Sequence, residues 1–313
     1  MHAAVVNAPG SVPVYAEFAE PSPGPGLREF ELVGAGLHQV VRSMAAGAHY
    51  GSTDAYPLVP GVDAVGRGDD GKCYYTGLVR APWGTMAERM VARFGIELPD
   101  GADPLAVAAG MNPAGAGWMP LQQQLEARGE LGTVAVLGAT GMAGRLAVQS
   151  ALALGASRVV AAGRNAAVLD ELEARGAHIV SLVDPGEALA EALRDDPPNL
   201  VLDFVWGPVA ELAFTALARR GVDEDAADIS YVQIGAVAGA MASLPASLLR
   251  SRRIRVSGSG AGSASMHDVL RTLPGLVERI GRGELDVTYT PYRLAEVGRA
   301  WAHTGPSRAV LTP

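Results

Sequence analysis

Short apolar runs alternate with segments of helical periodicity through residues 134–256. In the first of these segments Gly144, Val148 and Ala151 fall on one helical face. Apolar strands separated by helices of about ten residues are typical of βαβ units, whose parallel sheet is covered on both faces. Because crossovers in such units are nearly always right-handed, the order predicts an α/β fold with a doubly wound, six-stranded parallel sheet. The expected strands are residues 134–137, 158–162, 178–182, 200–204, 230–234 and 253–256, and the expected helices are residues 144–154, 166–175, 187–193, 209–219 and 245–252.

The chain before residue 99 has a different pattern, rich in Gly and Pro, which favours an irregular β domain. Its apolar runs are residues 3–6, 30–33, 61–65 and 86–91. After residue 257 an amphipathic stretch (266–280), a short helix (294–302) and a final strand (309–311) do not extend the sheet pattern. We expect this tail to return to the first domain. The expected domains are therefore residues 1–112 with 257–313, and residues 113–256.

Composition narrows the class of protein. Of 313 residues, 49 % are hydrophobic and 19 % are charged, which excludes disorder as the main state. The net charge of −8 argues against a nucleic-acid-coating or membrane-surface protein. Cys73 is the only cysteine, and Lys72 is the only lysine, so an internal disulfide and a P-loop lysine are both excluded. The first six residues read as a strand rather than a leader, and we expect a cytoplasmic location.

The sequence VAVLGATGMAG at residues 134–144 is the strongest chemical signal. It places Gly-x-x-Gly-x-x-Gly between a buried strand and a helix that begins at about Met142. Gly138 permits the sharp exit from the strand, Gly141 lets backbone approach a pyrophosphate, and Gly144 lets the helix pack closely. The helix N-terminus offers N–H groups and a positive dipole end to phosphates. The cofactor contacts expected here are Gly138, Thr140, Gly141, Met142 and Ala143.

The end of the second strand indicates which dinucleotide binds. An acid at this position would accept hydrogen bonds from the ribose hydroxyls of NAD, but the residue here is Gly163. Arg164 follows, and its planar guanidinium can pair with a 2′-phosphate or stack on adenine. Asn165 either adds a hydrogen bond to the phosphate or caps the next helix. These residues predict NADPH rather than NADH as the cofactor.

Motifs along nearly the whole chain resemble the zinc-independent quinone oxidoreductase branch of the medium-chain dehydrogenase/reductase superfamily. They are MHAAVVNAPG at residues 1–10, VPGVDAVG at residues 59–66, WGTMAE at residues 83–88, the glycine loop, IGAV at residues 234–237 and the closing helix and strand at residues 294–313. The resemblance implies a GroES-like catalytic domain and a Rossmann domain, with nicotinamide and substrate in the cleft between them. It also implies a homodimer through the outer strand at residues 253–256. Further cofactor contacts that we expect are Phe204, Val205, Gly235, Ala236, Val237, Gly258 and Ser259.

The same resemblance predicts that no metal is bound. Zinc-dependent relatives have a Cys near position 37 or 38 and a His directly after the position of Gly61. Here these positions hold Leu37, His38 and Val62. Since a catalytic zinc needs three protein ligands and the six histidines are scattered, we expect no metal site.

Hydride transfer leaves negative charge on a carbonyl or enolate oxygen, which a donor must stabilise. The resemblance places the loop of residues 44–54 at the substrate cleft. Tyr50 is the first candidate for the proton donor and His49 is the second, although both side chains could instead be packing residues. His38 is a weaker candidate, Trp206 could form a wall of the cleft, and water can protonate a reduced quinone without any side chain.

The predicted function is an NADPH-dependent, metal-free oxidoreductase that transfers hydride to a quinone or an α,β-unsaturated carbonyl. Two alternatives stay open: an enoyl-thioester reductase, and a non-catalytic NADPH-binding protein.

Overall fold

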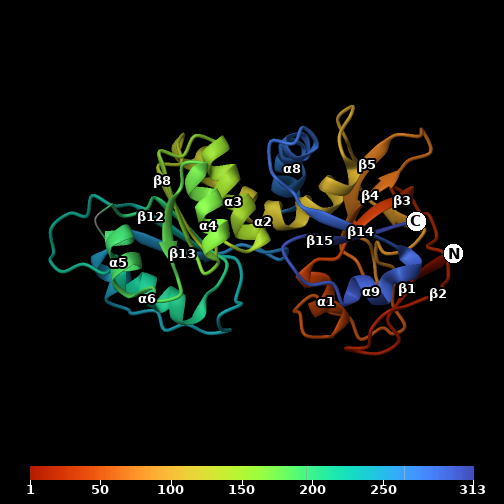
Figure 1. Cartoon of the computed structure of the whole chain (residues 1–313), viewed down its shortest axis with the longest axis horizontal. Helices are drawn as coiled ribbons and strands as arrows, with labels where there is room; N and C mark the ends of the chain where they lie inside the picture. Colours follow the sequence, from red (N-terminus) through yellow and green to blue (C-terminus); the bar gives the residue numbers. More distant parts are fainter. Residues whose placement is uncertain (195, 264) are drawn as a thin grey trace. The chain divides into compact units, whose positions relative to one another are not determined.

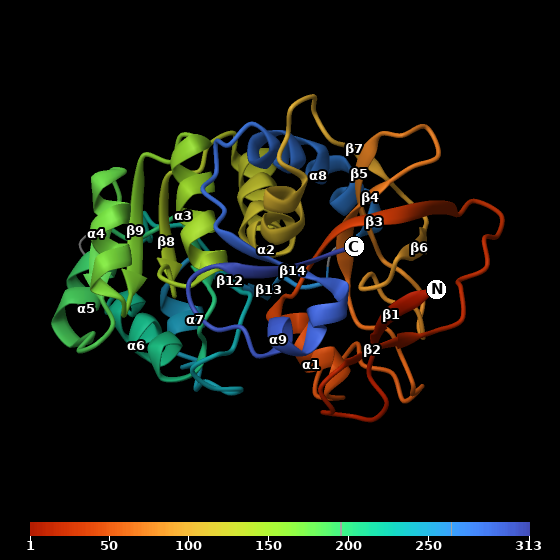
Figure 2. The same cartoon turned by 45° about the vertical axis from the view of Figure 1, so that its right-hand side comes forward.

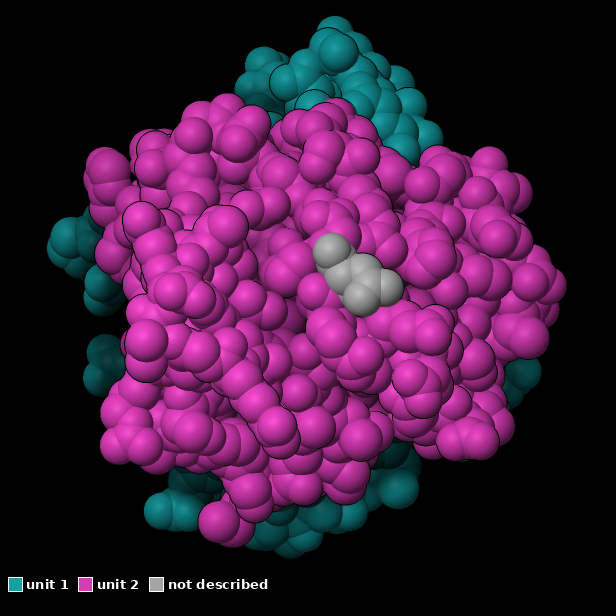
Figure 3. Space-filling view, turned by 90° about the vertical axis from the view of Figure 1, so that its left-hand side faces the viewer, with its two compact units in different colours: residues 1–112, 273–313 teal, residues 113–272 magenta. Residues whose placement is uncertain are grey.

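The computed structural model describes residues 1–194, 196–263 and 265–313. They form two compact units, coloured separately in Figure 3. Unit 1 comprises residues 1–112 and 273–313, and unit 2 comprises residues 113–272. Residues 257–272, which we expected in the first domain from the sequence, thus belong to unit 2.

Unit 2 contains a six-stranded sheet in which every neighbouring pair of strands is parallel (Figure 1). The strands lie in the order β10-β9-β8-β11-β12-β13. This is the 3-2-1-4-5-6 order of the Rossmann fold, so the predicted doubly wound sheet is confirmed. Its strands are β8 (Thr133–Leu137), β9 (Arg158–Gly163), β10 (His178–Ser181), β11 (Leu200–Asp203), β12 (Ile229–Gln233) and β13 (Ile254–Gly258).

Both faces of this sheet are buried under helices. Successive residues of a strand point to opposite faces, so they belong to different cores. Val134 and Val136 join a core with side chains of α3 and α4, whereas Ala135 and Leu137 join a core with those of α5 and α6. The helices are α3 (Met142–Ala153), α4 (Ala166–Ala174), α5 (Gly186–Arg194), α6 (Gly207–Leu217) and α7 (Leu248–Ser251). The helix expected at residues 245–252 is therefore reduced to the four residues of α7.

Unit 1 is built mainly from antiparallel strands. Its larger sheet has the order β14-β15-β3-β4-β5-β7, with β6 paired to β3, and β1 and β2 form a separate pair. The C-terminal strand β15 pairs antiparallel with β3, so the tail returns to this unit as predicted (Figure 2). The elements are β1 (His2–Val5), β2 (Val14–Glu17), β3 (Arg28–Gly36), α1 (Gln39–Ala45), β4 (Asp63–Arg67), β5 (Cys73–Gly77), β6 (Arg89–Ala92), β7 (Ile96–Glu97), β14 (Tyr289–Arg293), the 3₁₀ helix η1 (Leu294–Glu296), α9 (Val297–Trp301) and β15 (Arg308–Thr312).

The sequence pattern did not predict the longest helix, α2 (Pro104–Arg128). Pro113 and Pro120 lie inside it, and each removes a backbone hydrogen bond that a helix normally makes. Close packing compensates for this loss: Trp118 and Leu121 are buried, and a Cβ at Gly117 would lie 2.6 Å from the Cβ of Ala147. Among the described residues no helix has the length and apolar character needed to cross a membrane.

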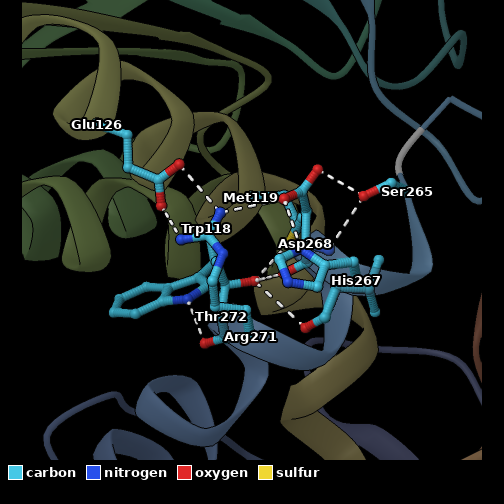
Figure 4. Close-up of polar contacts among 9 residues, drawn as sticks. Trp118, Met119, Glu126, Ser265, His267, Asp268, Arg271 and Thr272 are labelled. Carbon is cyan, nitrogen blue, oxygen red and sulfur yellow. Dashed lines mark hydrogen bonds and ion pairs between the residues drawn. The ribbon is translucent and has the colours of Figure 1, made fainter.

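Helix α8 (Met266–Gly281) begins in unit 2, where its first turns are fixed to α2 (Figure 4). The indole Nε1 of Trp118 donates to the carbonyl oxygen of Thr272 at 3.1 Å. Arg271 pairs with both carboxylate oxygens of Glu126. These contacts between residues far apart in the sequence explain why residues up to 272 belong to unit 2.

The two contacts are expected to differ strongly in their contribution to stability. Trp118 is 3 % exposed, so Trp118→Ala should lower the free energy of unfolding by about 3–5 kcal/mol. The Glu126–Arg271 pair is solvent-exposed, so Glu126→Gln should cost less than about 1 kcal/mol. Urea unfolding followed by circular dichroism measures both values, and equal losses in the two variants would contradict this assignment.

Candidate functional site

The cofactor residues predicted from the sequence gather where the parallel strands of unit 2 end. Each group directly follows or ends a strand, and all the strands point the same way. Ligands of doubly wound sheets bind at this carboxyl edge. The groups are Gly138, Thr140, Gly141, Met142 and Ala143 after β8; Gly163, Arg164 and Asn165 at β9; Phe204 and Val205 after β11; Gly235, Ala236 and Val237 after β12; and Gly258 and Ser259 at β13.

The glycine loop joins β8 to α3 with little free space. Gly138 has φ +90°, a conformation that favours glycine, and its N–H donates to Ala162 O at 2.8 Å. A Cβ at Gly144 would lie 2.2 Å from the carbonyl oxygen of Gly138. Both glycines are therefore required by the protein's own packing.

Gly141 differs from Gly138 and Gly144, because no protein atom lies close enough to exclude a larger residue there. A Cβ at this position would meet only Gly138 O, at 3.7 Å. Gly141 is the N-cap of α3, and no side chain caps that helix. The amides of Ala143 and Gly144 in the first turn have no acceptor among the described residues. Amides of this kind at a helix N-terminus can donate to a pyrophosphate.

The end of β9 lies against the glycine loop. The backbone N–H of Arg164 donates to Thr140 Oγ1 at 3.3 Å, and a Cβ at Gly163 would lie 2.3 Å from Thr140 Cγ2. An acid at position 163 would therefore force the Thr140 side chain to move. The Arg164 side chain is exposed and makes no ion pair within the described chain. Asn165 Oδ1 accepts from Val168 N at 3.4 Å, so this side chain caps α4.

A buried carboxylate shapes the turn after β11. Asp203 Oδ1 accepts from the backbone N–H groups of Val205 and Trp206, each at 2.8 Å, and Oδ2 accepts from the Tyr231 hydroxyl at 2.6 Å. Burial raises the pKa of Asp203 against the opposing effect of these hydrogen bonds. Burial also raises the pKa of Tyr231, with the Asp203 charge as the second cause.

Trp206 occupies a conformation that non-glycine residues rarely adopt, with φ 56° and ψ −156°. Its ring packs edge-on against Phe214 and Tyr231, with centroids 5.8 and 6.4 Å away. Packing and the Asp203 hydrogen bond thus hold the strained turn. The sequence pattern gave no signal for either the strain or the network.

The turns after β12 and β13 are tied to this strained turn by backbone contacts. A Cβ at Gly235 would lie 2.5 Å from Phe204 O, and Ala238 N donates to Val205 O at 2.8 Å. Ser259 N donates to Gln233 O at 2.8 Å. Val237, in contrast, is 81 % exposed. The turns after β11, β12 and β13 are therefore joined by backbone hydrogen bonds and close contacts.

The two candidate proton donors lie in unit 1 on an exposed loop after α1. Tyr50 is 76 % exposed, and the centroid of its ring lies 4.0 Å from the centroid of the His49 ring. His49 Nδ1 accepts from the backbone N–H of Gly51 at 3.0 Å. Neither side chain is buried among packing residues. The same loop also contributes Ser52 and Thr53 to a pocket, which we did not predict from the sequence.

His38, the weaker candidate, is buried at 2 % exposure, with Nε2 3.2 Å from Asp63 Oδ1. The other Asp63 oxygen accepts from Tyr75 at 2.9 Å, and burial raises the pKa of that phenol. In the part of the chain that the structure describes, no three His, Cys, Asp or Glu side chains lie close enough to hold a metal ion.

Comparisons with known proteins agree on one family. A family model for zinc-binding dehydrogenases matches residues 143–275. A probable NADPH-dependent quinone reductase of Emericella nidulans is 31 % identical across the full length of both chains. The quinone oxidoreductase of Thermus thermophilus, whose structures include a complex with NADPH, is 26 % identical, with a TM-score of 0.78 over 100 % of both chains. A mycobacterial quinone oxidoreductase shares the fold at 19 % identity, with a TM-score of 0.78 over 100 % of both chains.

The contact between positions 163 and 140 can be tested by adding one methyl group. Gly163→Ala should displace Thr140 and lower the free energy of unfolding by about 1–3 kcal/mol. Gly186→Ala is the matched control in the same unit, because a Cβ there meets nothing within 4 Å. Urea unfolding of both variants gives the comparison. A Gly163→Ala protein as stable as the control would contradict the tight contact.

Proposed function

The chain belongs to the quinone oxidoreductase branch of the medium-chain dehydrogenase/reductase superfamily, and we propose that it is an NADPH-dependent reductase of quinones or α,β-unsaturated carbonyls. Bound NADPH supplies a hydride, that is, two electrons and one hydrogen nucleus. With one further proton, a quinone becomes a hydroquinone and NADP⁺ is left. The described residues contain no cluster that would hold a metal ion, and the proposal requires none.

One observation carries the proposal: the N-terminus of α3 has no side-chain cap, and a Cβ at Gly141 would meet no atom closer than Gly138 O at 3.7 Å. The amides of the first turn would hold the pyrophosphate, and the helix dipole favours its negative charge. Arg164, which has no ion-pair partner in the described chain, would hold the 2′-phosphate. The turns after β11, β12 and β13 would bind the remainder of the cofactor. The same proposal assigns cofactor binding to one domain and catalysis to the GroES-like domain.

The proton has three proposed sources: Tyr50, His49 and water. The rings of Tyr50 and His49 are tilted against each other. Tyr50 is exposed and His49 is partly exposed, so either side chain can exchange protons with water. The phenol of Tyr50 is the first choice, because it donates a proton while offering an apolar face to a substrate. Water is the alternative, since a reduced quinone takes a proton from solvent readily.

The proposal also covers the oligomeric state of the protein and its location in the cell. The outer strands of the six-stranded sheet are β10 and β13. An outer strand has backbone groups free to pair with another chain. We propose a homodimer that pairs through β13, and a cytoplasmic location.

Removal of the Arg164 guanidinium should weaken NADPH binding by about tenfold, because a charge-assisted hydrogen bond contributes about 1.5 kcal/mol or more. NADH binding should be unchanged in Arg164→Ala, since NADH lacks the 2′-phosphate. Arg250→Ala is the control, because Arg250 is also exposed and unpaired within the described residues. Calorimetric titration of both cofactors measures the effect, and equal affinities for NADPH and NADH in the unmodified protein would remove the proposed preference.

The reaction itself is tested by single-turnover oxidation of bound NADPH with a panel of quinones, enones and enoyl thioesters. We expect quinones and enones to oxidise NADPH and thioesters to react at least tenfold more slowly. Faster reaction with thioesters would favour the enoyl-thioester reductase. Binding of NADPH without oxidation by any compound would favour a non-catalytic binding protein.

If Tyr50 supplies the proton, Tyr50→Phe should lower kcat for an enone by at least tenfold, since general acids typically contribute 10²–10⁴-fold. Tyr15→Phe is the matched control, because Tyr15 is also exposed and lies against a histidine ring, with ring centroids 5.0 Å apart. A kcat for Tyr50→Phe within about twofold of the unmodified enzyme, well under 1 kcal/mol, would exclude Tyr50 and leave His49 or water as the proton source.

A further inference from the structure

A groove in unit 2 lies between α2 and the strands β12 and β13, on the face of the sheet that α2 covers. Its volume is about 410 Å³, whereas one water molecule needs about 10–15 Å³ by the same measure. It therefore has space for a small organic molecule. The polar side chains at this α2–β13 groove include Gln124, Arg128, Asp228, Ser230, Arg255 and Ser257. We propose that the groove binds a small organic carboxylate, whose charge pairs with Arg128 and Arg255.

Positive charge is in excess at the groove. Arg128 donates to Asp228 Oδ2 at 2.6 Å, and Arg255 donates to Oδ1 at 2.8 Å. The hydrogen bond from Arg128 lowers the pKa of Asp228, so this carboxylate stays ionised at neutral pH. Two guanidinium groups thus share one carboxylate among the described residues that line the groove. One positive charge is left over, in a chain whose net charge is −8.

The two guanidinium groups also keep free donors. Each contacts Asp228 through Nη1, and neither makes another hydrogen bond within the described chain. A guanidinium has five N–H donors in a planar fork that matches a carboxylate. The hydroxyls of Ser230 and Ser257 likewise make no hydrogen bond with a described residue. This set of donors favours a ligand that brings negatively charged oxygen atoms.

Gln124 indicates a ligand independently of the charges. Its side chain is 4 % exposed, and its Nε2 has no acceptor within residues 1–194, 196–263 and 265–313. A buried donor without an acceptor lowers the stability of the fold. A ligand oxygen can supply that acceptor. Because Gln124 belongs to α2 and Arg255 to β13, the donors come from both walls of the groove.

The rest of the wall is apolar, which distinguishes an organic anion from an inorganic one. Ala127 on α2, Leu200 on β11 and Val232 on β12 line this part. A small inorganic anion would leave their surface in water, whereas the removal of apolar surface from water is favourable. A carboxylate with an apolar body pairs with the arginines and covers this surface as well.

The charged end of the groove lies at the amino edge of the parallel sheet. Asp228 directly precedes β12, and Leu200 is the first residue of β11. The candidate cofactor residues, in contrast, gather at the carboxyl edge. The carboxylate site and the candidate cofactor site are therefore separate, and the inference does not rest on the proposed function.

Calorimetric titration with benzoate tests the groove, because benzoate combines one carboxylate with an apolar ring. Benzamide has the same shape without the charge and should bind at least tenfold more weakly. Acetate lacks the ring and should also bind at least tenfold more weakly. No binding of benzoate, or an equal affinity for either of the other compounds, would overturn the proposal.

The position of the bound benzoate is tested by two arginine variants. Arg255→Gln should weaken binding by about tenfold, the effect of losing a charge-assisted hydrogen bond. Arg253→Gln is the matched control, because Arg253 also contacts Asp228, at 3.5 Å, but is not among the residues that line the groove. Since exposed charges are screened by salt, this control should change the affinity by less than about twofold. Equal losses in the two variants would overturn the assignment to the groove.

The role of Gln124 is tested by Gln124→Leu, which removes the unpaired donor and keeps a side chain of similar size. It should weaken benzoate binding by about fivefold without lowering the free energy of unfolding in urea. A loss of stability with unchanged benzoate binding would show a structural role and overturn the part assigned to Gln124. Saturating NADPH should leave benzoate binding unchanged, and displacement of benzoate would place it at the candidate cofactor site and overturn the groove.

Discussion

The carbonyl oxygen of Gly138 and the backbone of Gly144 approach so closely that a side chain at position 144 would lie 2.2 Å from that oxygen. This contact fixes the direction of α3 relative to β8. The direction determines where the first-turn amides point, and hence where a phosphate can be held. The turns after β9, β11 and β12 are then packed around the same point by Thr140, Asp203 and Phe204. The position of the helix N-terminus in the candidate cofactor site thus depends on one backbone contact.

The sequence predicted the six-stranded parallel sheet of unit 2 because the signals for it are local. Each strand of unit 2 is a short apolar run, and the three glycines of the loop lie within seven residues. Of the two roles weighed for Asn165, the structure has the helix cap, which is also a local interaction. Propensity and spacing are enough wherever the interacting residues are neighbours in the chain.

The sequence did not predict features that depend on distant contacts. α2 contains Pro113 and Pro120, and only its burial reveals that packing outweighs two missing hydrogen bonds. The strained backbone of Trp206 depends on Asp203 and Tyr231, which come together only in the folded sheet. Ser52 and Thr53 line a pocket only because the segments before β4 and after β5 lie beside them in the fold.

The contact between Thr140 and position 163 also bears on how cofactor choice can evolve. An acid at 163 would have to displace the threonine methyl, so as a single substitution it carries a cost in stability. A shorter residue at 140 would remove that cost. The effect of an acid at 163 therefore depends on residue 140, which is epistasis between the two positions.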